Sequence, residues 1–207
     1  MSIINNKNNL LFVLIQAEAG GSERVALDIA RHIDHSEYNV YASFFSAGTL
    51  LKEYKDVCEE VFVIPKKGGI DIHAMVQISN IIKDKRIDIV NAHHFMPFVY
   101  SILGSRVLNR RSLIYTEHTA EEVRQISRRF KYITNMLFFQ THAVVGISRE
   151  MAQLLKKEYP SHIGRIACIQ NGVDTERFQI EVNRDHKRAG LGLVPDHFVI
   201  GCVANFR

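Results

Sequence analysis

Residues 10–24 read LLFVLIQAEAGGSER, and three local signals follow one another in this stretch. The apolar run Leu10–Gln16 predicts a short buried strand. Two adjacent glycines come next, and then an apolar residue recurs every four positions from Val25 to Ile33, which gives a helix one apolar face. We expect Ser22 to cap that helix. A strand, a glycine turn and an amphipathic helix in this order predict the first half of a βαβ unit.

Strand-like and helix-like segments keep alternating as far as residue 170. The expected strands lie at 40–45, 61–65, 88–93, 112–118, 143–147 and 166–170, and the expected helices at 48–57, 72–85, 97–108, 128–142 and 149–159. This alternation predicts a Rossmann-like α/β fold with a mainly parallel sheet and helices on both faces. Because ligands bind beyond the carboxyl ends of the strands in such sheets, the residues that follow each strand are the candidates for chemistry.

The composition excludes several classes of protein. Of the 207 residues, 46% are hydrophobic and 23% charged, as in ordinary globular proteins, and the formal net charge of +4 is too small to indicate a nucleic-acid partner. The three cysteines form no Cys-x-x-Cys pair, so neither a disulfide framework nor a zinc knuckle is expected. The first apolar run is too short to span a membrane and lacks the flanks of a signal peptide. We therefore expect a cytoplasmic protein, either free or peripheral to the inner face of the membrane.

Gly20 and Gly21 follow the first strand. Glycines let the backbone approach a ligand closely, and the start of the next helix points free N–H groups at that ligand, which suits a phosphate. The alternative is a tight strand-to-helix turn. The spacing is neither Gly-x-Gly-x-x-Gly nor Gly-Lys-Ser/Thr, which argues against a dinucleotide fold and against a P-loop.

Histidines follow the fourth and fifth expected strands. His93 and His94 end the fourth strand, and Glu117 and His118 end the fifth. A histidine can donate to a sugar hydroxyl or a phosphate, or act as a base; the alternative is a structural, hydrogen-bonded residue. Adjacent strand residues point to opposite faces, so we expect only one of His93 and His94 to face the cleft. No His-x-x-x-His spacing occurs, and no metal is expected.

Residues 121–142 combine basic and aromatic side chains. Such a segment suits an anionic membrane surface or a lipid-linked acceptor. The alternative is a core helix with a solvated basic start. We favour the core helix, because apolar residues surround too much of the predicted helix to form one stripe.

Taken in order, the strand-end motifs resemble the N-terminal half of the retaining glycosyltransferases of family four, which have the GT-B fold. The resemblance rests on Gly20–Arg24, Asp88–His93, Tyr115–His118, Val145–Ser148, and Asn171–Asp174 with Phe178. It implies that residues 1–175 form the N-terminal, acceptor-side domain. It also implies that residues 176–207 are a linker and the first strand, Phe198–Ala204, of a C-terminal donor-side domain.

The resemblance also assigns roles to residues. It implies that Gly20 and Gly21 approach the donor phosphates or the transferred sugar, and that His118 contacts that sugar as the catalytic residue. No cofactor or metal is expected, because protein cations and helix dipoles stabilise the leaving diphosphate in this family.

The remaining assignments concern the acceptor and the crossing between domains. His93 and Glu117 fall on the acceptor side, and Asn171 and Gly172 fall where the chain crosses to the second domain. The partners implied are a nucleotide-sugar donor and a carbohydrate or lipid-linked acceptor, as in polysaccharide biosynthesis.

The function expected is sugar transfer with retention of configuration. The alternatives are a sugar-nucleotide epimerase of GT-B-like fold and a non-catalytic carbohydrate-binding module, because a fold alone does not fix chemistry. We expect residues 1–207 alone to be inactive, since the donor-diphosphate site belongs to the second domain. An unpaired apolar strand at Phe198–Ala204 favours association, which leaves a homo-oligomer open.

Overall fold

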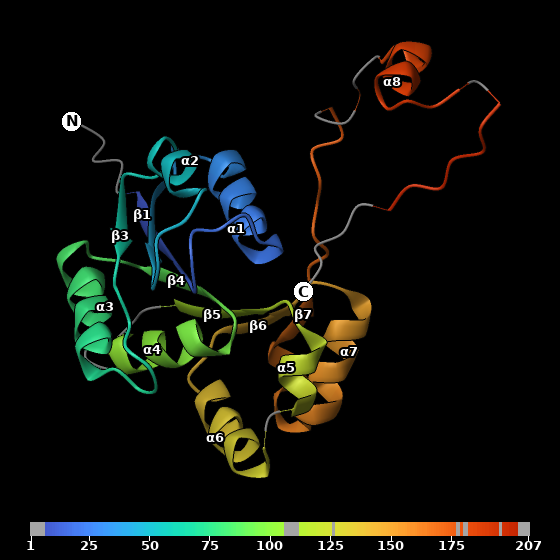
Figure 1. Ribbon diagram of the computed structural model, residues 1–207. Coiled ribbons are helices and arrows are strands. Elements are labelled where there is room, and N and C mark those ends of the chain that lie inside the picture. The colour runs from blue at the N-terminus through green and yellow to red at the C-terminus, as the bar shows by residue number, and fades with distance from the viewer. Residues whose placement is uncertain are drawn as a thin grey trace. The chain divides into compact units, whose positions relative to one another are not determined.

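The strand-forming runs pair into one parallel sheet in the computed structural model, which describes residues 7–105, 112–125, 127–176, 179, 182–194 and 196–202 (Figure 1). The strands are β1 (Asn8–Leu14), β2 (Tyr38–Phe44), β3 (Glu60–Val63), β4 (Ile89–His93), β5 (Ser112–Glu117), β6 (Ala143–Gly146) and β7 (Ile166–Cys168). Their order is β3-β2-β1-β4-β5-β6-β7, and every neighbouring pair is parallel. The predicted Rossmann-like α/β fold is confirmed.

Helices connect the strands. They are α1 (Gly21–His32), α2 (Leu51–Lys55), α3 (Ile72–Asp84), α4 (Phe95–Ser105), α5 (Ala120–Gln125), α6 (Arg128–Phe138) and α7 (Arg149–Glu158), followed by the 3₁₀ helix η1 (Pro160–Arg165). The sequence did not predict α5 or η1. None of the described helices is long and apolar enough to cross a membrane.

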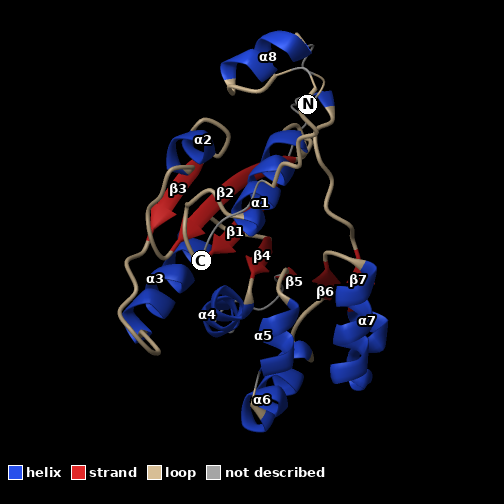
Figure 2. Ribbon diagram, turned by 45° about the vertical axis from the view of Figure 1, so that its right-hand side comes forward, coloured by secondary structure: helices blue, strands red, loops and turns tan. Residues whose placement is uncertain are grey.

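The core lies on both faces of the sheet because successive strand side chains point to opposite sides. On β1, Leu10, Phe12 and Leu14 pack in a cluster with buried residues of α1 and α2. Leu11 and Val13 belong to a second cluster, with buried residues of α3, α4 and α7. Figure 2 shows these two groups of helices on opposite sides of the red strands.

The start of α1 differs from the prediction. We expected Ser22 as the N-cap, but the helix begins at Gly21, and the N-cap is Gly20, which makes no side-chain capping bond. Ser22 lies inside the first turn, where its hydroxyl is used by other side chains. The prediction for α7 is confirmed, because Ser148 accepts a hydrogen bond from the backbone N–H of Met151.

The chain divides into two compact units, Met1–Asn171 and Gly172–Arg207. In the second unit the structure describes one helix, α8 (Arg184–Gly190), capped by Asn183. The prediction of a strand at Phe198–Ala204 is wrong for residues 198–202, which form no strand. Residues 203 and 204 lie outside the described residues, as does Phe178. A strand needs a neighbour to complete its hydrogen bonds, and Phe198 is instead 92% exposed. The assignment of this unit to a donor-side domain stays a prediction.

The last residue of β6 provides a test of the packing between sheet and helix. A Cβ added at Gly146 would lie 2.6 Å from the backbone nitrogen of Ala152 in α7. Because backbone cannot rotate aside, we expect Gly146→Ala to lower the free energy of unfolding by about 1–3 kcal/mol, measured by urea denaturation. Gly164→Ala is the control, since its Cβ would meet nothing within 4 Å. Equal stability of the two variants would show that α7 moves away without cost.

Candidate functional site

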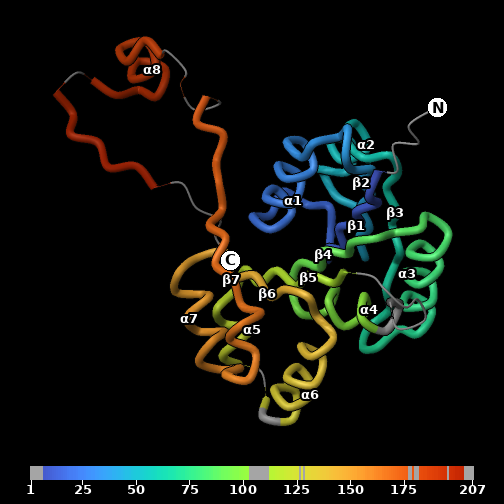
Figure 3. The backbone as a smooth tube through the Cα atoms, turned by 180° about the vertical axis from the view of Figure 1, so that it is seen from behind, coloured from blue at the N-terminus to red at the C-terminus, as the bar shows by residue number. Residues whose placement is uncertain are grey.

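The sheet changes its direction of winding between β1 and β4. From β1 the chain proceeds to β2 and β3 on one side, and from β4 it proceeds to β5, β6 and β7 on the other. The connections that leave β1 and β4 therefore part at the carboxyl edge, which is where open α/β sheets bind ligands. Figure 3 shows β1 and β4 next to each other within the sheet, seen from behind. Polar side chains meet at the carboxyl edge, and we call them the switch-point cluster: Ser22, His93, His94, Glu117, His118 and Glu122.

His94 departs from the regular strand backbone. Its φ is 72°, in the left-handed region that few residues other than glycine adopt. The strand alternation therefore ends at His93, and the rings of His93 and His94 both lie against His118. That only one of them faces the cleft stays a prediction. Nδ1 of His93 lies 2.9 Å from Nε2 of His118, and the His94 ring centroid lies 5.1 Å from that of His118. All three histidines meet at one place.

Glu117 is fully buried at the end of β5. Its Oε1 accepts hydrogen bonds from the backbone N–H groups of His118, at 2.8 Å, and Thr119, at 2.9 Å, while its Oε2 accepts one from the hydroxyl of Tyr115. Burial raises the pKa of Glu117, and the bonds from Tyr115 and Thr119 act against that rise. The carboxylate thus holds the turn that presents His118. Its predicted place on the acceptor side stays a prediction.

His94 is the histidine of the cluster whose pKa is raised. Its Nδ1 lies 3.4 Å from Oε1 of Glu122 and 3.8 Å from Oε1 of Glu117. Burial acts to lower the pKa of His94, but the surrounding carboxylates, Glu122 first, outweigh it, so the net shift is upward. The proximity of His94 in turn lowers the pKa of Glu122. These two side chains form an ion pair in a half-buried position.

Glu122 was not predicted from the sequence because helix α5 was not predicted. The signal was present: Thr119 and Glu122 stand in the Thr-x-x-Glu spacing that commonly opens a helix. The short helix that follows brings Glu122 back to His94.

His118 and His93 are the neutral members of the cluster. Burial, followed by the positive charge of His94, lowers the pKa of His118 to about 4. Burial lowers the pKa of His93 well below its usual range, helped by His118 and His94. A neutral imidazole has one donor and one acceptor nitrogen, so their mutual hydrogen bond occupies one nitrogen of each ring. Nδ1 of His118 bonds to none of the other described residues. His93 is fully buried, and its acceptor-side role stays a prediction.

The glycine turn is coupled to this cluster. Nε2 of His94 lies 2.9 Å from Oγ of Ser22, which donates to Oε2 of Glu23 at 2.8 Å. An added Cβ at Gly20 would lie 2.3 Å from the same Oε2, whereas one at Gly21 would meet nothing within 4 Å. Gly20 therefore leaves room for Glu23, and Gly21 faces open space. Their predicted role toward donor phosphates stays a prediction, and a phosphate here would share the helix start with a carboxylate.

Two further groups bear on the predictions. Ligand atoms of His94, Glu117 and Glu122 lie within 4.8 Å of one another, as a metal site would require. However, Glu117 already accepts three hydrogen bonds, and His94 already pairs with Glu122. These three side chains therefore fit an ion pair between themselves better than the binding of a metal ion. The division between the two units falls between Asn171 and Gly172, and the interdomain role of this pair stays a prediction.

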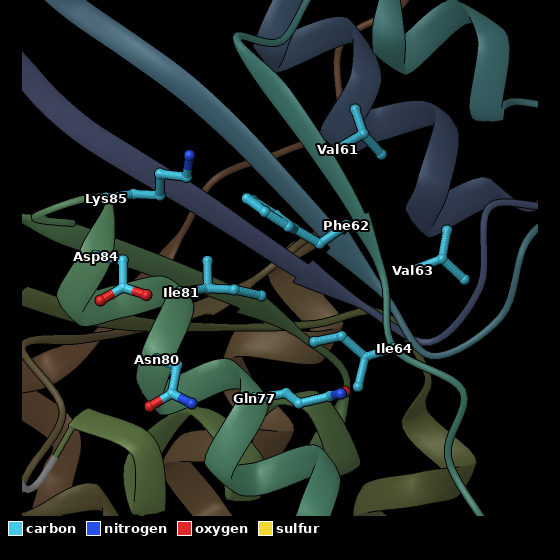
Figure 4. A pocket seen from close by; sticks show the side chains of 9 residues that line it. All are labelled: Val61, Phe62, Val63, Ile64, Gln77, Asn80, Ile81, Asp84 and Lys85. Carbon is cyan, nitrogen blue, oxygen red and sulfur yellow. The ribbon is translucent and has the colours of Figure 1, made fainter.

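A separate pocket of about 450 Å³ lies between β3 and α3 (Figure 4). Its lining is Val61, Phe62, Val63, Ile64, Gln77, Asn80, Ile81, Asp84 and Lys85. The ammonium group of Lys85 already has partners in this pocket, because it pairs with Glu60 and lies 5.8 Å from the centroid of the Phe62 ring. The pocket includes no member of the switch-point cluster, which remains the candidate site.

Comparison with known proteins places this geometry in a family. A model of Glycosyltransferase Family 4 matches residues 19–177, which include the whole switch-point cluster. Among curated proteins, the chain is 21% identical over 212 residues to the UDP-Gal:alpha-D-GlcNAc-diphosphoundecaprenol alpha-1,3-galactosyltransferase of Escherichia coli. That match covers 98% of this chain and 55% of the relative.

Solved structures share the fold. HepE from Anabaena, in complex with UDP and glucose, superposes with a TM-score of 0.72 at 18% identity, over 89% of this chain and 50% of HepE. A glycosyltransferase from Rickettsia africae superposes with a TM-score of 0.73 at 20% identity, over 92% of this chain and 51% of that protein. The chain thus spans about half the length of the proteins that it matches.

The neutral His118 predicts a pH dependence of stability. Between pH 6.5 and about 4, the unfolded chain binds a proton at this residue that the folded chain does not. The free energy of unfolding therefore falls as the pH falls through this window, by at most about 1.4 kcal/mol per pH unit from this residue. We expect His118→Gln to lose less stability than the parent chain between pH 6.5 and 4.5 in urea titrations. His73→Gln, an exposed control on α3, should behave like the parent. If the free energy of unfolding changed with pH identically in His118→Gln and the parent, the lowered pKa of His118 would be contradicted.

Proposed function

The chain belongs to glycosyltransferase family 4, and from this premise we propose that it is the acceptor-side half of an enzyme that transfers a sugar from a nucleotide-sugar donor to a lipid-linked carbohydrate. The observation that carries the proposal is the neutral His118, held by the buried Glu117 at the switch point of the sheet. A neutral imidazole at a carboxyl edge can donate to an uncharged sugar hydroxyl without attracting an anion in its place.

The names of the similar proteins support the choice of substrates. The Escherichia coli relative is named for a UDP-galactose donor and an acceptor sugar on diphosphoundecaprenol. HepE binds UDP and glucose in its solved structure. We infer a UDP-sugar as donor and a sugar on a polyprenyl diphosphate as acceptor.

The cluster suggests a division of labour in the reaction. Nδ1 of His118 contacts the transferred sugar, while His93 fixes the ring from behind. The charged His94 lies between His118 and the start of α1, where its positive charge and the free N–H groups of the helix stabilise the donor phosphates. The leaving diphosphate gains most of its stabilisation from a donor-side domain.

The proton balance follows from this arrangement. The acceptor hydroxyl attacks the anomeric carbon as the bond to the UDP oxygen breaks, and the hydroxyl proton passes to the leaving phosphate. Attack on the same face as departure gives retention of configuration. No side chain of this chain is assigned as the base, and the pKa of His118 is too low for that role.

The experiment compares three proteins with UDP-galactose and a lipid-diphosphate sugar acceptor. A protein in which a donor-side domain follows the chain should transfer galactose, and His118→Ala in that protein should lower turnover by about 100-fold, as for loss of one preorganised donor. Residues 1–207 alone should show no transfer.

Other outcomes decide between the alternatives. Transfer by residues 1–207 alone at the rate of the longer protein would contradict the two-domain account. Epimerised donor without any use of acceptor would favour the epimerase, and acceptor binding without turnover would favour the non-catalytic module.

A further inference from the structure

The helix that follows α5 is not a core helix, contrary to the prediction from its sequence. Its inward side is limited to residues such as Thr134 and Phe138, which are buried. Large apolar side chains cover the opposite side. We call these the α6 apolar face: Phe130, Tyr132, Ile133, Met136 and Phe139, to which we add Ile163 of η1, the residue after His162, on which Phe139 packs. Each is about half exposed or more, up to 69% for Tyr132.

The position of α6 explains this exposure. In Figures 1, 2 and 3 the helix lies at the periphery of the first unit, beyond α5 and farther from the sheet than α4. A helix that packs on the sheet turns its large apolar side chains inward, whereas α6 exposes most of its large apolar side chains to solvent. A contiguous apolar face of this kind on a protein surface marks an interaction site.

Basic residues stand at the start of the same helix. The segment Arg128–Phe138 contains Arg128, Arg129 and Lys131 and no acidic residue. Positive charges near a helix N-terminus oppose the helix dipole, so helix stability does not explain them. Lys131 pairs with Glu158, whereas Arg129 and the preceding Arg124 of α5 are exposed. Basic groups at one end of an aromatic face match an anionic lipid surface.

The α6 apolar face begins beside the switch-point cluster. The ring of Phe130 packs edge-on against Phe95, with centroids 6.5 Å apart, and Phe95 directly follows His94. The other end lies at Phe139, which packs on His162. The helix of 11 residues is about 16 Å long. A surface that contacts the whole face therefore also reaches the edge where the acceptor would bind.

We propose that the α6 apolar face is a membrane-docking surface, which rests on an anionic bilayer and presents the switch-point cluster to an acceptor held in that bilayer. The position of the cluster relative to the lipid rests on the proposed function. The attraction to the bilayer does not, because it comes from side chains that the reaction does not use.

The test is co-sedimentation of the 207-residue chain with vesicles of phosphatidylcholine and phosphatidylglycerol that contain neither acceptor nor donor. We expect binding at low salt that weakens as salt rises. Tyr132→Ser combined with Met136→Ser should weaken binding at least about tenfold, because two large apolar side chains no longer enter the interface. Arg129→Gln should weaken it about fivefold.

Matched controls lie on α3, where Val76 and Lys83 are also exposed. Val76→Ser and Lys83→Gln should bind vesicles like the parent chain. Circular dichroism and urea unfolding of the Tyr132/Met136 variant check that the fold survives. We expect that it does, because both side chains are exposed. No binding to anionic vesicles at low salt, or equal loss with the α3 controls, would overturn the proposal.

A second measurement separates the other outcomes. Sedimentation velocity reports whether two copies of the chain associate. A dimer that the Tyr132/Met136 substitutions dissociate, together with no vesicle binding, would show that the face joins two copies and would overturn membrane docking. Transfer to a water-soluble, short-chain diphosphate acceptor by a two-domain protein tests the proposed function alone, so failure of either idea is visible without the other.

Discussion

The carboxylate of Glu117 is buried at the end of β5, and a buried carboxylate is stable only when donors surround it. Two backbone N–H groups and the Tyr115 hydroxyl supply those donors, and in doing so they fix the path of the chain after the strand. That path places His118 against His93 and begins α5, which carries Glu122. The ring of His94 then lies between Glu122 and Glu117, which raise its pKa. The geometry of the site follows from satisfying one buried charge.

The winding of the sheet supplies the second half of the arrangement. Because β1 and β4 are neighbours and their connections diverge, the start of α1 comes next to the end of β4. The hydroxyl of Ser22 links the two, since it contacts His94 and donates to Glu23. A helix start, one charged imidazole and one neutral imidazole thus converge at a single edge.

The seven strands of the sheet could be predicted from the sequence because they are short, mainly apolar runs, and their positions agree with the structure to within two residues. The strand-end rule also brought attention to His93 and His118. Three features depended on information that local pattern does not hold. The left-handed backbone of His94 turns its ring toward His118, where the ring of His93 also lies. Gly20, rather than Ser22, is the N-cap of α1. The outward direction of the apolar residues of α6 depends on which helices already cover the sheet, and α5 was not among the predicted ones.

The site depends on two opposite pKa shifts in neighbouring rings: Glu122 raises the pKa of His94, and burial lowers the pKa of His118. Nitrogen-15 NMR titration of the histidine rings measures this directly in the parent chain and in Glu122→Gln. We predict that His94 stays protonated above pH 6.5, that His118 stays neutral down to about pH 4, and that Glu122→Gln lowers the pKa of His94. If His94 and His118 titrate together near pH 6.5 in the parent, and Glu122→Gln changes neither, the account of the site is wrong.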